Sequence, residues 1–183
     1  FLVKDEDYEA FSKYVVDTFL KPIFAEAKLT SGQGDPEKWF SLINSSQVKA
    51  LKERVDLDFA HDNSERFSPG ENVKLKLYTK NVKELLVKEF EINAFNYYLK
   101  NGAEVNTGIE LDGLAATREQ TVTYEDPPMR RILRNFAFNK LKKRGVYVVE
   151  FIGNGISSRT LIRKGTLRLI EKVGPAGHEF RIL

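Results

Sequence analysis

Cysteine is absent from all 183 residues, and this absence excludes disulfides, thiolate metal sites, iron–sulfur clusters and cysteine nucleophiles together. Long apolar runs are also absent, since none approaches the ~18 residues that a membrane-spanning helix needs. A large excess of charge of one sign is also absent. The net charge is +3, which is too weak to indicate nucleic-acid binding by itself. The rest is typical of a globular protein, with 42% hydrophobic and 30% charged residues, and the chain is long enough to bury a core without covalent staples.

No targeting signal is visible in the sequence. The first residue is Phe1, not an initiator methionine, and no charged-then-apolar leader precedes a small-residue cleavage site. We therefore expect the chain to be an excised or processed piece of a longer protein. Cytosolic and bacterial envelope proteins can both lack cysteine, so composition does not fix the compartment.

The first third of the chain has helical patterning. Apolar residues from Tyr8 to Phe19 recur at helical spacing within residues 5–28, and Pro22 is expected to end or kink this helix near Leu20. The pattern predicts an amphipathic helix that stops or bends halfway.

Two more helix starts follow this segment. Asp35 is suited to the N-cap and Pro36 to the first helical position, while Ser45 and Ser46 can cap a third short helix. The period then changes, since residues 56–60 alternate as a strand does.

Residues 66–183 have the pattern of strands separated by turns. Apolar residues alternate over Val73–Leu77, which predicts a strand with one buried face. The segment Val146–Ile152 is more hydrophobic and is expected to be a central strand covered on both faces. Alternation slips by one phase near Lys88 within Leu85–Ile92, which suggests a β-bulge.

Short strands at intervals of roughly ten residues, without helices between them, favour an antiparallel sandwich. We therefore predict an α+β chain of two domains, a small helical unit over residues 1–60 and an antiparallel β-sandwich over residues 66–183. The segment Ala94–Lys100 fits either a strand or a helical turn. Further strands are predicted at Gln120–Tyr124, Arg131–Phe138, Thr160–Arg163, Leu167–Ile170 and Glu179–Leu183.

No catalytic, cofactor or metal site emerges from the sequence. The run Gly153-Asn154-Gly155 is glycine-rich enough to suggest a phosphate cradle, but it lacks the third glycine and the following helix, and Asn-Gly between strands favours a hairpin. His61 and His178 have no second ligand at metal-binding spacing. Serines lack the nucleophile elbow. We therefore predict no enzyme activity, no cofactor and no metal.

A basic cluster lies between Pro127 and Val149, where no acidic residue occurs. One hypothesis is a polyanion or nucleic-acid contact, with Phe136 and Phe138 stacking on bases. The alternative, which the apolar alternation favours, is a strand with its rings inward that ends in a solvated cationic loop. The candidate contacts are Arg130, Arg131, Arg134, Lys140, Lys142, Lys143 and Arg144.

An aromatic cluster at Phe95–Tyr98 is the second candidate contact. Tyr97 and Tyr98 could form a platform for a sugar or a peptide, while the alternative is that the rings cover an open end of the sandwich. The first interpretation makes the domain a sugar-binding sandwich.

Three segments carry a family resemblance: Phe67–Val73, Lys80–Ile92 and Arg144–Phe151. They resemble an early macroglobulin-type domain of an α2-macroglobulin-like protein, over about residues 66–172. The resemblance implies a macroglobulin or immunoglobulin-like sandwich, one of several in tandem. In that family such modules form a ring-like scaffold around a protease bait segment and, often, a thioester.

The chain departs from the family at several points. It has no cysteine for the thioester motif, no identifiable bait segment, and a helical part at residues 1–60 that does not match a macroglobulin module. We therefore predict a non-enzymatic structural or interaction module whose partners are neighbouring domains of the same parent chain or another protein. The resemblance implies an extracytoplasmic location, in the cell envelope or secreted.

Overall fold

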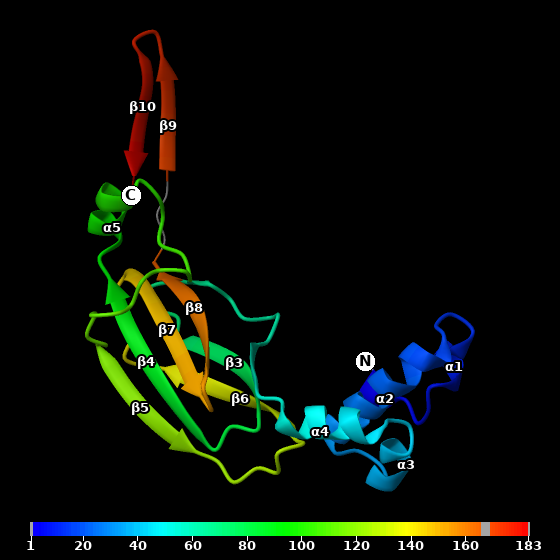
Figure 1. Ribbon diagram of the computed structural model, residues 1–183. Coiled ribbons are helices and arrows are strands. Elements are labelled where there is room, and N and C mark those ends of the chain that lie inside the picture. The colour runs from blue at the N-terminus through cyan, green and yellow to red at the C-terminus, as the bar shows by residue number, and fades with distance from the viewer. Residues whose placement is uncertain (1, 166–168, 183) are drawn as a thin grey trace.

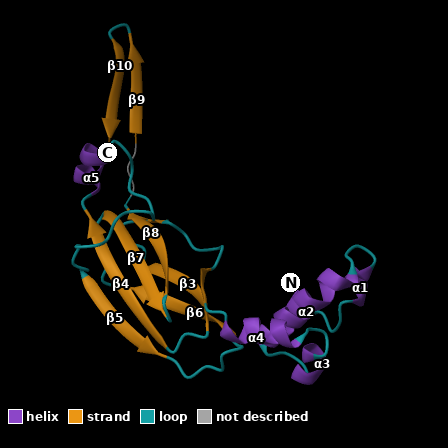
Figure 2. Ribbon diagram, viewed as in Figure 1, coloured by secondary structure: helices purple, strands orange, loops and turns teal. Residues whose placement is uncertain are grey.

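A computed structural model describes residues 2–165 and 169–182. A group of short helices lies beside one end of a two-sheet β-sandwich, and a lone hairpin projects from another end (Figure 1). Figure 2 shows that the helices are confined to the N-terminal part and to α5 (Ala94–Asn101), which resolves the open prediction for that segment as a helix. The predicted α+β class, with N-terminal helices before a sandwich, is confirmed.

Two of the N-terminal helices, α3 and α4, begin at a side-chain N-cap. Asp35 caps α3 as predicted, since its Oδ1 accepts the backbone N–H of Glu37 at 3.0 Å. Helix α4 is capped by Asn44 and not by the predicted serines, through a capping box with Gln47. The helices are η1 (Leu2–Lys4), α1 (Glu9–Ser12), α2 (Asp17–Ser31), α3 (Pro36–Phe40) and α4 (Ser45–Glu53). None of the helices within the described ranges combines the length and hydrophobicity that crossing a bilayer requires.

The sequence predicted that Pro22 would end or kink the helix near Leu20; the helix does not end there, since α2 continues through Pro22 to Ser31. Pro22 removes one backbone hydrogen bond, but Phe24 and Leu29 are buried among the other helices and hold the segment in place. The helix ends instead at Gly32, whose φ of 66° gives the left-handed C-cap.

The strands form three separate sheets. The three-stranded sheet has the order β1-β3-β6 and the five-stranded sheet the order β2-β8-β7-β4-β5. Within residues 2–165 and 169–182, β9 and β10 pair only with each other. All pairings are antiparallel except the short parallel pair β2–β8. The strands are β1 (Asp56–Phe59), β2 (Arg66–Phe67), β3 (Val73–Lys80), β4 (Glu84–Ile92), β5 (Arg118–Thr123), β6 (Arg131–Phe138), β7 (Gly145–Gly153), β8 (Ile156–Lys164), β9 (Leu169–Gly174) and β10 (Gly177–Ile182).

An apolar core lies between the two larger sheets. Every second residue of β3 from Val73 to Leu77 is fully buried there, which confirms the predicted alternation. Phe151 of β7 is also fully buried in this core. Three rings meet its ring edge-on, with centroids 4.9 to 6.4 Å away: those of Phe59, Phe136 and Phe138.

Strands β4 and β7 are covered on both faces. Val148 and Phe90 belong to a second apolar cluster on the side away from the main core, while Val87 belongs to the main core. The ladder between β4 and β7 is continuous over Leu85–Ile92, so the predicted bulge near Lys88 is absent. The phase slip in the sequence arises because both faces of this strand are buried.

A tight turn joins β7 to β8, as predicted for Gly153-Asn154-Gly155. Asn154 has a φ of 46° and Gly155 a φ of 82°, the two positive values that a type I′ hairpin turn requires. A strand and not a helix follows this turn, so the geometry is that of a hairpin and not of a phosphate cradle.

The observed sandwich differs from the predicted domain of residues 66–183 at both ends. At the N-terminal side, β1 pairs with β3, so Asp56–Phe59 belongs to the sheet and not to the helical unit. At the C-terminal side, β9 and β10 form a sheet of their own. The predicted strands Leu167–Ile170 and Glu179–Leu183 fall on this hairpin, apart from residues 167, 168 and 183, which lie outside the described residues.

Polar contacts join the helices to the sandwich. Lys80 is 1% exposed at the end of β3, and its Nζ donates to the carbonyls of Leu51 and Arg54 at the C-terminal end of α4. Beside it, the buried carboxylate of Asp56 accepts from Arg54 Nε at 2.8 Å and lies 3.4 Å from Arg131 Nε. The helical unit is therefore fixed to the sandwich by a buried cation and a shared carboxylate.

Glu89 is a buried acid in the five-stranded sheet. It is 4% exposed and lies opposite Arg118 of the neighbouring strand. Burial raises the pKa of its carboxyl above the ordinary 4.5, and the charge of Arg118 only partly opposes this rise. The protonated form therefore stabilises the fold, by a contribution that is present below pH 4.5 and lost as pH rises through the folded-state pKa.

Replacing Glu89 with glutamine is expected to raise the melting temperature at pH 7, because a neutral amide avoids the burial of a charge. The gain should shrink as the pH is lowered toward 4.5, where the wild-type carboxyl is itself protonated. Thermal unfolding followed by circular dichroism across this range measures both effects. Glu84→Gln, on an exposed position of the same strand, is the matched control, and equal shifts for the two variants at pH 7 would contradict the role of burial.

Candidate interaction groove

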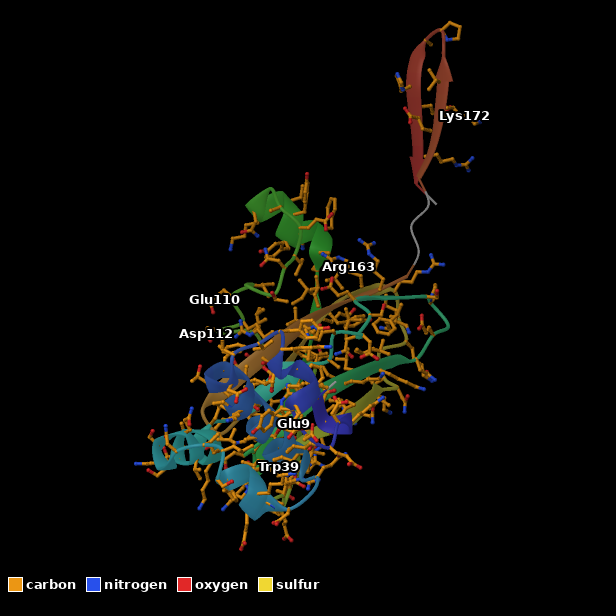
Figure 3. The ribbon with its side chains drawn as sticks, turned by 90° about the vertical axis from the view of Figure 1, so that its right-hand side faces the viewer. Glu9, Trp39, Glu110, Asp112, Arg163 and Lys172 are labelled. Atoms are coloured by element: carbon orange, nitrogen blue, oxygen red, sulfur yellow. The ribbon has the colours of Figure 1, made fainter. Side chains whose placement is uncertain are left out.

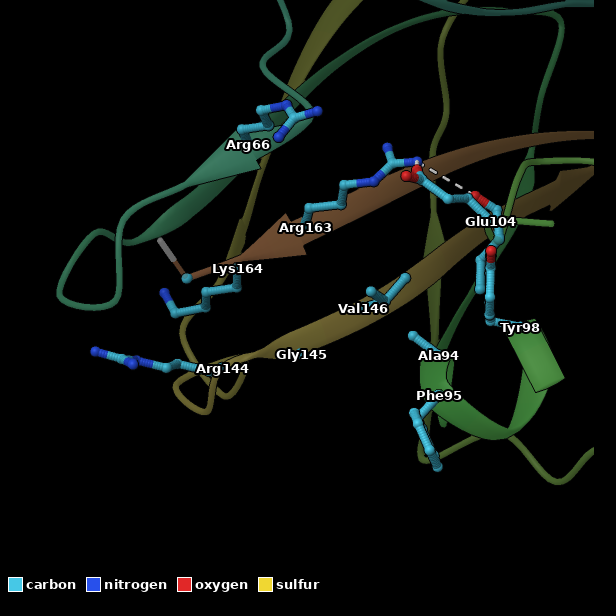
Figure 4. A pocket seen from close by; sticks show the side chains of 12 residues that line it. Arg66, Ala94, Phe95, Tyr98, Glu104, Arg144, Gly145, Val146, Arg163 and Lys164 are labelled. Atoms are coloured by element: carbon cyan, nitrogen blue, oxygen red, sulfur yellow. Dashed lines mark hydrogen bonds and ion pairs between the residues drawn. The ribbon is translucent and has the colours of Figure 1, made fainter. Parts of the chain in front are cut away.

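A groove of about 600 Å³ opens where helix α5 faces the ends of β2, β7 and β8 (Figure 4). Cations from the strand ends lie along one side of it and rings of α5 along the other. We call this site the basic–aromatic groove, defined by Arg66, Phe95, Tyr98, Arg144, Arg163 and Lys164.

The parallel pair β2–β8 builds the cationic side. It sets Arg66 beside Arg163 and Phe67 beside Lys164, although 97 positions separate the two strands along the chain. Backbone bonds fix this register, since Arg163 N–H donates to the carbonyl of Glu65 at 2.7 Å and Gly165 N–H to that of Phe67 at 2.8 Å. The hydrogen-bonded strand ends therefore hold the cations in a defined arrangement.

Two of the four cations are held by the protein. Arg163 lies 3.4 Å from the carboxylate of Glu104 and donates to the carbonyl of Val105 at 3.3 Å (Figure 4). Lys164 is buried, and its Nζ donates to the carbonyl of Glu71. These contacts hold the two side chains in place at the floor of the groove. They also occupy hydrogen-bond donors of Arg163 and Lys164, so neither cation is readily available to a ligand.

The other two cations are available to a partner. Arg66 and Arg144 are exposed, and within the described part of the chain neither side chain has a hydrogen-bond or ion-pair partner. Two unneutralised guanidinium groups beside rings favour an acidic partner, because charge-assisted bonds from arginine to carboxylates are strong and directional.

Helix α5 supplies the aromatic side. Its N-cap is Asn93, whose side chain accepts from the N–H of Asn96 at 3.0 Å. The outer face of the helix is apolar and open, with Phe95 71%, Tyr98 54% and Leu99 67% exposed. Such rings next to arginines are typical of protein interaction surfaces.

The seven predicted polyanion contacts do not form one site. Arg130, Arg131 and Arg134 lie at or beside β6, whereas Lys140, Lys142, Lys143 and Arg144 lie on the exposed loop before β7. Of the seven, the structure places only Arg144 in the basic–aromatic groove. Polyanion binding stays a prediction for the loop.

Arg131 and Arg134 are already paired within the protein. Arg131 lies 2.8 Å from the carboxylate of Asp58, with its guanidinium 4.0 Å from the centre of the Tyr78 ring. Arg134 pairs with the carboxylate of Asp126 and stacks on Tyr124. The Nε of Arg130 is buried without a hydrogen-bond partner in the described structure. Arg131 and Arg134 therefore serve the sandwich, whereas the guanidinium of Arg130 lies beside Gly32 at the end of α2.

The two predicted aromatic contacts separate as well. Tyr98 lines the groove, while Tyr97 is half-buried against the second apolar cluster, so a joint platform of the two rings stays a prediction. Sequence reasoning missed Arg66, Arg163 and Lys164, because only the parallel pairing of β2 with β8 brings them together. The three cations in residues 159–164 were the available signal, and they do not show which strand lies beside them.

No metal-binding geometry is found among the described residues, where no three His, Asp or Glu side chains converge. The groove itself offers cations and rings, and its one carboxylate, Glu104, is paired with Arg163. This arrangement suits recognition of an anionic surface.

The fold and the groove define a helix-preceded β-sandwich of the immunoglobulin-like class. Residues 85–165 match the family model of the AbpF first immunoglobulin-like domain, and residues 1–55 match that of the Actin-binding protein F N-terminal domain. The chain is 41% identical over 184 aligned positions to Actin-binding protein F of Dictyostelium discoideum. That alignment covers 99% of this chain but only 8% of the length of that protein.

A solved structure with some likeness is native alpha-2-macroglobulin from Escherichia coli, spanning domains MG0-NIE-MG1. It has 14% sequence identity and a TM-score of 0.45, covering 65% of this chain and 41% of that one. The predicted sandwich is present in the two larger sheets and the core between them. The family models that match, however, are those of an actin-binding protein and not of macroglobulins. The extracytoplasmic location, which followed from that resemblance alone, stays a prediction.

Proposed function

We propose that this chain is a non-enzymatic structural and interaction module of a long, multidomain, actin-binding protein. The observation that carries the proposal is the 41% identity to Actin-binding protein F, which extends over 99% of this chain and 8% of that protein. Two family models of that protein also match in succession, the N-terminal domain before the first immunoglobulin-like domain. The scaffold role is the one expected from the sequence, transferred to a different kind of parent chain.

The basic–aromatic groove is the contact surface in this proposal. Arg66 and Arg144 present free positive charge, and Phe95 and Tyr98 present open rings beside them. An acidic protein surface with an apolar centre complements this pattern, since opposite charges steer association and desolvated rings supply affinity. The relative's name identifies actin as the partner to test.

We expect residues 1–183 to co-sediment with actin filaments, and the bound fraction to fall as salt is raised. The double variant Arg66→Glu/Arg144→Glu should raise the dissociation constant by about tenfold or more, because it reverses both free charges of the groove. Sedimentation at several filament concentrations measures the constant.

A matched control reverses two exposed charges elsewhere. Lys74→Glu/Lys142→Glu changes the net charge by the same amount, and neither residue lines the groove. Equal weakening by the two double variants would contradict a specific role of the groove. Absence of wild-type sedimentation at low salt would contradict actin contact by this module and leave it a scaffold segment.

A further inference from the structure

The hairpin β9–β10 stands apart from every other sheet. Its hydrogen-bonded ladder runs from the pair Leu169–Ile182 to the pair Gly174–Gly177, and within the described residues neither strand joins another sheet. Figure 3 shows Lys172 on this hairpin, far from Arg163 at the end of the sandwich. Both outer edges of the hairpin therefore offer unpaired backbone groups.

A two-stranded hairpin of this length is marginally stable in water without further strands or a covering layer. Described side chains from Glu171 to Glu179 are exposed, and they include Val173 at 70%. Across the two strands, the carboxylate of Glu171 lies 2.6 Å from His178 Nδ1, and an exposed pair of this kind contributes little to stability. The hairpin has the strand pairing of a β-domain, but none of its described side chains, at residues 171–179 and 181, is buried.

The sandwich is complete without the hairpin. The five-stranded sheet ends its last strand, β8, at Lys164, and Gly165 follows with a φ of 125°. The match to the first immunoglobulin-like domain ends at residue 165 as well. Two independent boundaries, one from hydrogen bonding and one from the family model, thus place the hairpin outside this domain.

We propose that β9 and β10 are the opening hairpin of the next β-domain, and that the chain following residue 183 in the complete protein supplies the strands that cover it. This inference rests on the proposed function, in which the chain is a segment of a long multidomain protein. In the complete protein the exposed Val173 becomes part of the core of that second domain. Lys172, which points to the opposite face by strand alternation, stays in solvent.

Hydrogen exchange read by mass spectrometry tests the proposal. In the polypeptide of residues 1–183, the amides of residues 169–182 should exchange like an unstructured chain, while those of β7 stay protected. In the complete protein, the same 169–182 amides should be protected by roughly a hundredfold or more, as expected for strands inside a folded domain. Equal exchange in the two polypeptides would overturn the proposal.

A pair of variants in the complete protein sharpens the test. Val173→Asp should remove the protection of residues 169–182 and leave that of β7 unchanged, whereas Lys172→Thr should leave both unchanged. Neither variant should alter the melting of the 1–183 polypeptide. Equal effects of the two variants in the complete protein would contradict burial of Val173.

A second copy of the chain is the rival occupant. If the 1–183 polypeptide shows protection of the hairpin that grows with its concentration, alongside dimers in analytical ultracentrifugation, the next-domain proposal is overturned. These measurements do not involve actin, so loss of filament binding and failure of this inference are separate results.

Discussion

Replacing Phe151 with alanine is expected to lower the free energy of unfolding by about 3–5 kcal/mol. The ring is fully buried between the two sheets, and its removal leaves a cavity that three surrounding rings cannot fill without moving. It also ends three edge-on aromatic contacts, each worth about 0.5–1.5 kcal/mol beyond area burial. Urea denaturation followed by fluorescence and circular dichroism measures the change.

The matched control is Phe95→Ala, which makes the same substitution at a ring that is largely exposed on α5. It should change the unfolding free energy by about 0.5 kcal/mol or less. A loss for Phe151→Ala no larger than that for Phe95→Ala would mean that the sheets do not pack through this ring.

Replacing Lys80 with methionine is expected to destabilise the chain by about 2–4 kcal/mol. The methionine fills a similar volume but donates no hydrogen bond, so the carbonyls of Leu51 and Arg54 lose their donor. Burial lowers the pKa of Lys80, and the nearby charge of Asp56 opposes this effect. The loss should be local, because these bonds join α4 to the sandwich.

Two measurements separate this local loss from general instability. Limited proteolysis should cut Lys80→Met faster than wild type between residues 54 and 66, and urea denaturation gives the free energy. Lys74→Met is the control, since Lys74 is exposed on the same strand, and it should match wild type in both assays. Unchanged proteolysis of Lys80→Met would argue against a helix–sandwich link at this lysine.

Local patterns in the sequence were sufficient to predict the structure of a segment where one physical cause determines that structure. The alternation of Val73–Leu77 has a single buried face as its cause, and the Asn154–Gly155 turn depends on two positive φ values that few residues tolerate. The helix end predicted at Pro22, as one alternative to a kink, did not occur, because tertiary packing of Phe24 outweighs one lost hydrogen bond. The prediction of a bulge near Lys88 was wrong, because a strand that is buried on both faces has apolar residues out of strict alternation without any bulge.

The groove could not be predicted from sequence for a topological reason. Its cationic side requires β2 to lie parallel to β8, a pairing that neither strand's pattern specifies. The predicted cluster instead grouped residues that are close in sequence, and the structure divides them between strand β6 and a loop. Arg144 and Tyr98, proposed from the sequence as a polyanion contact and an aromatic contact, both line the groove, and their roles as contacts stay predictions.

The position of β7 has a consequence for how the chain folds during synthesis. This strand lies between β4 and β8 in the five-stranded sheet, yet it begins only at Gly145. Until it leaves the ribosome, β4 has no neighbour on that side, and the core against β3 lacks Val149 and Phe151. The helical unit can collapse early around Phe24 and Trp39, but the sandwich has to close late and in one step. Residues 73–138 are thus the stretch of the nascent chain that waits longest with its apolar side chains in water.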